Sequence, residues 1–133
     1  MAKTKELTPA MRQYMRVKEG LSDDTILLFR MGDFYEIFFE DAKRAAPLMD
    51  IVLTARGGTP MCGVPYHSVR TYIARILEKG LKVAIAEQLE DPRTAKGIVK
   101  RDITQVITPG TVMDDTLLSS GKSNFLVALA PNK

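Results

Sequence analysis

The strongest constraint on the fold is an apolar run over residues 26–39, which Gly32 and Asp33 interrupt near its middle. Glycine and aspartate tolerate the backbone angles of tight turns, whereas aromatic and β-branched residues favour strands. An apolar run with such a break therefore predicts a hairpin of two short strands.

The second strand of this hairpin carries a carboxylate among aromatic residues. Side chains alternate between the two faces of a strand, so Phe34 and Glu36 share one face while Tyr35 and Ile37 share the other. If Phe34 were buried, Glu36 would be buried with it, and an unpaired buried carboxylate costs several kcal/mol or more. The pattern therefore predicts buried Tyr35 and Ile37, and an exposed Phe34 ring beside the Glu36 carboxylate.

The composition is that of an ordinary globular domain. The chain has 133 residues, of which 45% are hydrophobic and 26% are charged, and this length suits one domain. Its single cysteine, Cys62, excludes an internal disulfide framework, and the polar residues 1–6 have no apolar run behind them. No stretch approaches the roughly 18 apolar residues of a membrane span. These features predict a cytoplasmic protein with no membrane partner.

Positive charge is concentrated in the second half of the chain. The net charge is only +3, but residues 51–133 hold 11 Lys and Arg against 7 Asp and Glu. The densest cluster comprises Arg93, Lys96, Lys100 and Arg101. Such a cluster can meet phosphates, although charge alone fits a solvated loop and strand edge equally well.

Two helices are expected on either side of the hairpin. Thr8 and Pro9 form a typical helix start, and the helical spacing continues to about Val17 with Met11 and Met15 in the core. The second helix begins after the hairpin, and its inward residues are expected to be Phe38, Ala42, Ala45 and Met49.

Pro47 conflicts with a continuous second helix, because proline removes a backbone N–H and clashes with the preceding turn. The helix either stops near Ala46 or kinks there. Further along, we expect a short buried strand at 51–54, a loop with special backbone angles at 55–67, a helix between Ser68 and Gly80, and strands near 82–89 and 98–108.

The alternation of strands and helices predicts an α/β class. We expect a single domain with a mixed β-sheet of about five to six strands, flanked by about three to four helices. Residues 114–116 are expected to cap one helical turn. The apolar run at 125–130 either completes this sheet or begins a following domain.

Motifs for phosphate or zinc binding are incomplete. Gly121-Lys122-Ser123 has the end of a P-loop, but Thr116 stands where the loop requires glycine, and a strand pattern follows instead of a helix. Cys62 and His67 are too few for the tetrahedral coordination of a structural zinc site. We therefore expect no metal site.

Catalytic motifs are equally weak. There is no Gly-x-Ser-x-Gly sequence, and His67 is the only histidine that could serve as a base. A metal-dependent nuclease remains an alternative, with Asp50, Glu87 and Lys82 as its candidate residues, although no motif links them. We therefore expect no catalytic residues.

An exposed ring beside a carboxylate predicts a wedge into stacked bases. Apolar wedges enter the minor groove and part a base step, at a cost that falls where pairing is already faulty. The minor-groove edges of A and T offer a carboxylate only acceptors, whereas a mispaired base can expose an imino hydrogen to Glu36. A protonated Glu36 could instead donate to a ring nitrogen. Two alternatives stay open: Phe34 lies in the core, or a partner protein covers it in a protein-interaction module.

The chain also carries a series of distinctive strings, namely Phe29–Phe38, Asp41–Lys43, Asp50–Gly57, Pro60–His67, Ala86–Pro92 and Thr108–Thr111. In this order they closely resemble the N-terminal mismatch-recognition domain of the bacterial MutS DNA mismatch-repair proteins. The resemblance covers nearly the whole chain, from about Thr8 to Asn124.

The resemblance implies roles for individual residues. In that family, the phenylalanine of a Phe-x-Glu motif stacks on a mispaired or unpaired base, and the glutamate hydrogen-bonds to that base. The matching positions here are Phe34 and Glu36. The positions that align near the mismatch or the adjacent backbone are Met31, Arg56, Met61 and Arg101, of which the two arginines are expected to contact phosphates.

The resemblance also implies a longer parent protein. Members of that family clamp DNA as homodimers, act with the MutL repair protein, and use ATP and Mg in ATPase domains, whereas this segment is expected to need no cofactor. We thus expect a non-enzymatic module that binds mismatched double-stranded DNA in the bacterial cytoplasm, at the nucleoid. Residues 1–7 are expected to form a flexible N-terminus, 8–118 the mismatch-recognition domain, and 119–133 a hinge and the first strand of a truncated connector domain.

Overall fold

The apolar run at 26–39 forms the predicted hairpin in the computed structural model, which describes residues 7–110. Its strands are β1 (Thr25–Met31) and β2 (Phe34–Phe38), which pair antiparallel. The turn falls at Gly32 and Asp33, and Gly32 has a φ of 63°. That angle lies in the left-handed region, which glycine enters without steric cost. The hairpin prediction is therefore confirmed.

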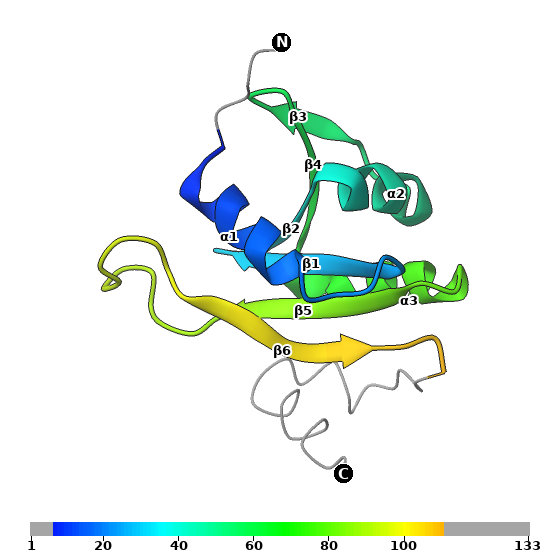
Figure 1. The fold of residues 1–133 in the computed structure, drawn as a ribbon. Helices are drawn as coiled ribbons and strands as arrows, with labels where there is room; N and C mark the ends of the chain where they lie inside the picture. Colours follow the sequence, from blue (N-terminus) through cyan, green and yellow to red (C-terminus); the bar gives the residue numbers. More distant parts are fainter. Residues whose placement is uncertain (1–6, 111–133) are drawn as a thin grey trace.

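Four more strands extend the hairpin into a six-stranded mixed sheet in the order β3-β4-β2-β1-β5-β6 (Figure 1). These strands are β3 (Thr54–Arg56), β4 (Thr59–Pro65), β5 (Lys82–Gln88) and β6 (Arg101–Ile107). Among the strands within residues 7–110, only β1 and β5 pair parallel. Since parallel neighbours need a crossover connection, the chain leaves β1 and passes through three other strands and three helices, one of them a short 3₁₀ helix, before it reaches β5.

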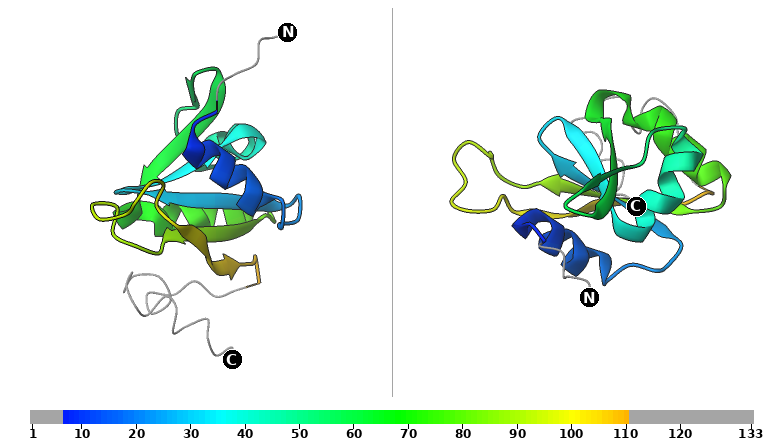
Figure 2. Two further views of the ribbon diagram at one scale, coloured as in Figure 1. Left: turned by 60° about the vertical axis from the view of Figure 1, so that its left-hand side comes forward. Right: turned by 90° about the horizontal axis from the view of Figure 1, so that it is seen from above.

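Helices cover both faces of the sheet (Figures 1 and 2). They are α1 (Pro9–Lys18), α2 (Phe39–Met49), α3 (Val69–Glu78) and the short 3₁₀ helix η1 (Tyr66–Ser68). One core joins α2 and α3 to the sheet face that carries Ile26, Leu28 and Ile37. The other core joins α1 to the face that carries Leu27 and Phe29. The predicted α/β class with a mixed sheet is confirmed.

The first helix begins as predicted. The Thr8 hydroxyl oxygen accepts the backbone N–H of Met11 at 3.1 Å, and Met11 is buried. The prediction of a core Met15 is wrong, because this side chain is 43% exposed and lines a groove between α1 and α2. Phe38 is buried as predicted, but it ends β2 and packs edge-on against the Tyr14 ring of α1.

The second helix continues through Pro47 to Met49. Pro47 lies in the last turn, where its ring is exposed to solvent. Asp50 then adopts the left-handed conformation, and the N–H of Ile51 donates to the carbonyl of Ala46 at 3.0 Å. This arrangement is a Schellman motif, which satisfies carbonyl groups at the end of a helix.

The predicted buried strand at 51–54 is wrong. Residues 51–53 form no strand, and Val52 and Leu53 are 76% and 44% exposed. The strand β3 begins at Thr54 and lies at the edge of the sheet, so the apolar residues before it gain little burial. The predicted loop at 55–67 is wrong as well, because it contains β4 and a β3–β4 turn at Gly57 and Gly58.

The later elements largely follow the pattern. Helix α3 begins after Ser68 and ends before Gly80, β5 ends one residue earlier than predicted, and β6 is shorter than predicted by three residues at its N-terminal end and by one at its C-terminal end. No helix within residues 7–110 has the length and apolar character needed to cross a membrane. The expectations for residues 1–6, for the cap at 114–116, for the run at 125–130 and for the hinge at 119–133 lie outside the described residues.

Candidate functional site

Strand register places the predicted site residues on one face of the sheet, the face that α1 partly covers. Directly paired residues of neighbouring strands point to the same side. The pairs that define this face are Arg56 with Thr59, Met61 with Phe38, Gly63 with Glu36, Phe34 with Met31, Phe29 with Ala86 and Gln88 with Arg101. The sheet thus places Phe34, Glu36, Met31 and Met61 on three adjacent strands, whereas Arg56 and Arg101 lie on its two opposite edge strands.

The Phe34 ring projects from this face into solvent. Its side chain is 43% exposed, whereas Tyr35 and Ile37 on the opposite face are 2% and 0% exposed. Phe38 shares the face of Phe34 but is buried under α1. The prediction that Tyr35 and Ile37 face the core while Phe34 faces solvent is confirmed, and the alternative of a core Phe34 is excluded.

Two hydrogen bonds fix the turn before Phe34. The backbone N–H of Gly32 donates to the side-chain oxygen of Gln88 at 2.8 Å. The backbone N–H of Tyr66 donates to the carbonyl of Asp33 at 2.9 Å. The exposed ring therefore stands on a turn that is tied to β5 on one side and to η1 on the other.

Arg30 adds a third tie to this turn. Its Nε donates to the carbonyl of Gly32 at 2.6 Å, its Nη1 pairs with Oε1 of Glu87 at 3.2 Å, and its guanidinium lies 3.9 Å from the centroid of the Tyr66 ring. The hydroxyl of Tyr35, which pairs with Arg30 across the hairpin, also donates to Glu87. Burial, and then the negative charge of Glu87, raise the pKa of Tyr35, so this hydroxyl stays a donor.

The Glu36 carboxylate is half-buried and lies over Gly63 of β4. Burial raises its pKa, and the positive charge of Arg56 opposes part of that rise. Burial, and then the Glu36 charge, also raise the pKa of the neighbouring Cys62 thiol to about 12. The carboxyl is therefore easier to protonate than an ordinary surface glutamate.

The two arginines of the site differ in exposure. Arg56 is exposed beside the β3–β4 turn. Arg101 is half-buried: its Nε donates to the carbonyl of Arg30 at 2.6 Å and its Nη1 to the side-chain oxygen of Gln13 at 2.7 Å. Its guanidinium also lies 5.0 Å from the centroid of the Phe29 ring. Arg101 therefore joins α1 to the sheet, and burial lowers its pKa.

Sequence reasoning missed the residues that support the hairpin. They are Arg30, Gly63, Tyr66 and Gln88. Buried Cys62 and Val64 alternate with half-buried or exposed neighbours, which is a strand signal, but the glycine and proline content of 57–65 obscures it. The other supports come from strands and a turn that only the fold brings together.

The candidate nuclease residues are not brought together. Asp50 follows α2, whereas Lys82 and Glu87 lie at opposite ends of β5, about 16 Å apart at the usual rise per strand residue. Glu87 is engaged by Arg30, and Lys82 lies 3.9 Å from a carboxylate oxygen of Asp24. Among the described residues, no group of three or more His, Cys, Asp or Glu side chains is placed to hold a metal ion.

The remaining candidates are separated as well. Cys62 is buried with its thiol toward the carbonyl of Ala42, whereas His67 is exposed in η1. In the basic cluster, Arg93 is bound to the carboxylate of Asp91, and both belong to the segment between β5 and β6.

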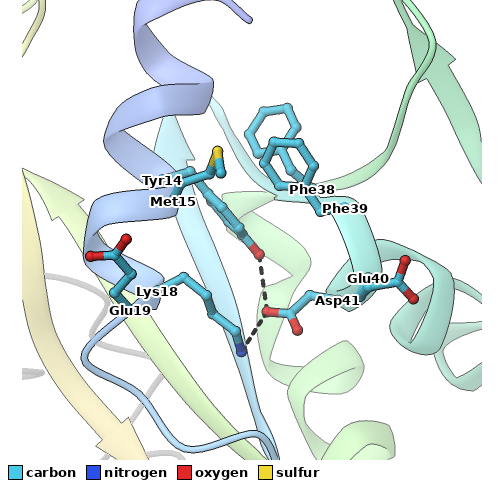
Figure 3. Close-up of a pocket in the computed structure, with 8 residues that line it drawn as sticks. All are labelled: Tyr14, Met15, Lys18, Glu19, Phe38, Phe39, Glu40 and Asp41. Atoms are coloured by element: carbon cyan, nitrogen blue, oxygen red, sulfur yellow. Dashed lines mark hydrogen bonds and ion pairs between the residues drawn. The ribbon is translucent and has the colours of Figure 1, made fainter. Parts of the chain in front are cut away.

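A second surface feature is a groove of about 300 Å³ between α1 and the start of α2 (Figure 3). Its lining residues are Tyr14, Met15, Lys18, Glu19, Phe38, Phe39, Glu40 and Asp41. Asp41 is 3% exposed, and its Oδ2 accepts the Tyr14 hydroxyl and the Leu27 N–H, each at 3.0 Å. Oδ2 also lies 3.0 Å from the Lys18 ammonium. These contacts join α1, β1 and α2, so the polar side of the groove is structural.

Comparison with known proteins adds an independent observation. The family model described as MutS domain I matches residues 8–116. A DNA mismatch repair protein MutS from Syntrophomonas wolfei is 57% identical over 129 residues, which cover 93% of this chain and 15% of that protein. Proteins of the same name from Oceanobacillus iheyensis and Myxococcus xanthus are 52% and 55% identical over 130 residues, which cover 94% and 95% of this chain. The chain spans about 15% of the length of such relatives.

Proposed function

Because this chain belongs to the MutS domain I family, we propose that it is the mismatch-recognition module of a longer DNA mismatch repair protein. The observation that carries the proposal is the exposed Phe34 ring beside the half-buried Glu36 carboxylate, at the end of a braced hairpin. Mispaired or unpaired bases in double-stranded DNA are the proposed target.

Phe34 acts as the wedge in this proposal. The ring enters the minor groove and stacks on the faulty base, at an unstacking cost of about a few kcal/mol per base step. A mispaired step has lost part of its stacking and pairing already, so the net cost is smaller there. The bonds from Gln88 and Tyr66 to the turn support this role, because a fixed hairpin loses little conformational freedom on binding.

Glu36 acts as the discriminator. As a carboxylate it is repelled by phosphates and finds only acceptors on A and T in the minor groove, so it disfavours intact duplex. The raised pKa supports a second possibility, in which a protonated Glu36 donates a hydrogen bond to a ring nitrogen of the displaced base. In either protonation state, Glu36 forms a hydrogen bond with a base that has lost its pairing partner.

The other residues of the face have secondary roles in the proposal. Arg56 contacts a DNA phosphate, and Met31 and Met61 contact the duplex near the mismatch. Arg101 contacts the DNA backbone and also holds α1 against the sheet through its bonds to Gln13 and Arg30. Because a net charge of +3 and a few phosphate contacts release few counterions, the 133-residue chain alone should bind DNA weakly.

The longer protein would supply the rest of the activity. We propose that it is a homodimer that acts with the MutL repair protein in the bacterial cytoplasm, at the nucleoid, and that ATP and Mg bind outside this segment. The segment itself is proposed to be a non-enzymatic binding module without a cofactor of its own.

The test is the affinity of the full-length protein for two duplexes that differ only by one mispaired base. Phe34→Ala should remove the difference in affinity between them while the melting temperature stays nearly unchanged, since the ring is largely exposed. Val106→Ala is a matched control, because Val106 is also a 43% exposed strand residue.

Two outcomes would contradict the proposal. If the Phe34→Ala protein still binds the mismatched duplex more tightly than the matched one to the same degree as wild type, Phe34 is not the wedge. Loss of binding to a partner protein, with discrimination intact, would instead assign Phe34 to a protein-interaction module.

A further inference from the structure

Gly63 lies directly opposite Glu36 in the antiparallel pairing of β4 with β2. A Cβ atom on Gly63 would lie 2.5 Å from Oε1, 2.9 Å from Cδ and 3.2 Å from Oε2 of Glu36. The carboxylate therefore occupies the volume that any other side chain at Gly63 would fill.

The backbone itself does not require glycine at this position. Gly63 is absent from the positive-φ glycines of residues 7–110, which include Gly32, Gly57 and Gly58. It lies inside a regular strand, where glycine loses packing and conformational freedom without a gain in geometry. Close approach by another group is the remaining physical reason for a glycine here, and the approaching group is the Glu36 carboxylate.

We propose that Gly63 is a specificity-determining residue, because its bare Cα forms the niche that holds the Glu36 carboxylate against the sheet. This inference rests on the proposed function. The niche keeps the carboxylate at the level of the sheet behind the Phe34 ring, so that it meets a base only after the ring has entered. A methyl group in the niche would lift the carboxylate toward the duplex and into water.

The groups around the niche come from three strands. Arg56 acts on the carboxylate from β3, and Gly63 contributes the bare backbone of β4. The Cys62 thiol of β4 points to the opposite face of the sheet, where the Glu36 charge still acts on it. Phe29 of β1 lies opposite Glu36 on the other side. The niche is thus partly apolar, in agreement with a half-buried carboxylate.

A double-mutant cycle in the full-length protein tests the niche. The four proteins are the wild type, Gly63→Ala, Glu36→Ala and the double variant, and each is titrated with a fluorescent matched duplex and with the same duplex carrying one mispair. We expect Gly63→Ala to lower the ratio of the two affinities at least threefold, and to have no further effect when Glu36 is already alanine. Gly20→Ala is the control, because a Cβ there meets no atom closer than 3.8 Å.

Thermal stability and pH dependence provide readouts that separate a local role from a structural one. The carboxylate is the free end of a flexible side chain, so Gly63→Ala should leave the melting temperature within a few degrees of wild type. The pH at which discrimination changes should fall in Gly63→Ala, since the displaced carboxylate is more hydrated.

Each contrary outcome is decisive. Three results would overturn the proposed role of Gly63. They are an unchanged ratio of the two affinities in Gly63→Ala, an equal fall of that ratio when Glu36 is already alanine, and a large fall in the melting temperature of Gly63→Ala. If Phe34→Ala removes discrimination while Gly63→Ala does not alter it, the niche fails and the proposed function stands. If Phe34→Ala leaves discrimination intact, the proposed function itself fails.

Discussion

The guanidinium of Arg30 lies 3.9 Å from the centroid of the Tyr66 ring, which joins the end of β1 to the short helix η1. The same guanidinium pairs with Glu87 of β5 and bonds to the carbonyl of Gly32. One side chain thus links the turn before Phe34 to two elements that are distant in the sequence. A planar group with several fixed donors is suited to this role.

Arg30→Lys is expected to destabilise the 133-residue chain by about 1–2 kcal/mol, because lysine keeps the charge but loses the stacking and the second hydrogen bond. Urea unfolding measures this change. Arg93→Lys is the matched control, since the Arg93 side chain is 89% exposed and its surface ion pair contributes little. Equal stabilities for the two variants would show that the Arg30 contacts are not stabilising.

Asp41→Asn is expected to destabilise the chain by about 2 kcal/mol, since the buried carboxylate accepts charge-assisted hydrogen bonds that a neutral amide weakens. The Asp41 side chain is 3% exposed and lies 3.0 Å from both the Lys18 ammonium and an Arg44 guanidinium nitrogen. The neighbouring Glu40→Gln is the control, because the Glu40 side chain is 79% exposed. Guanidinium unfolding of both variants is the measurement, and a loss below about 1 kcal/mol in Asp41→Asn would contradict the prediction.

The raised pKa of Glu36 predicts a pH-dependent stability. A carboxyl whose pKa is higher in the folded state favours folding below its unfolded pKa, and this contribution is lost as the pH rises through the folded pKa. Glu36→Gln is neutral at every pH, so it should be more stable than wild type at pH 7, and the gain should vanish below about pH 4. Melting temperatures across this range test it, with Glu78→Gln as the control for removing one negative charge. If Glu36→Gln remains more stable than wild type at low pH, the stabilisation comes from packing and not from removal of the charge.

Local sequence signals predicted those parts of the fold that depend on neighbours along the chain. The Gly32-Asp33 turn, the alternation from Phe34 to Ile37 and the capped start of α1 were all correct. Each rests on backbone preferences and strand periodicity, which act within a few residues.

Local signals failed where burial depended on which other element of the fold lies alongside the residue. Val52 and Leu53 read as a buried strand, but they precede an edge strand. Met15 has the spacing of a core residue, but it borders a groove between α1 and α2. In both cases the apolar pattern shows that the residue favours burial. Whether a neighbouring element covers the residue depends on the tertiary fold.

The sequence by itself determined that Phe34 and Glu36 stand on the same side of a strand, because the two-residue period of a strand is a property of the backbone. Only the tertiary structure decided how each one is held. The Phe34 ring is exposed because α1 covers Phe38 and stops short of it, and the Glu36 carboxylate is half-buried because β4 presents Gly63 opposite. Those neighbours arrive through long-range pairing, whose partners no local pattern of residues specifies.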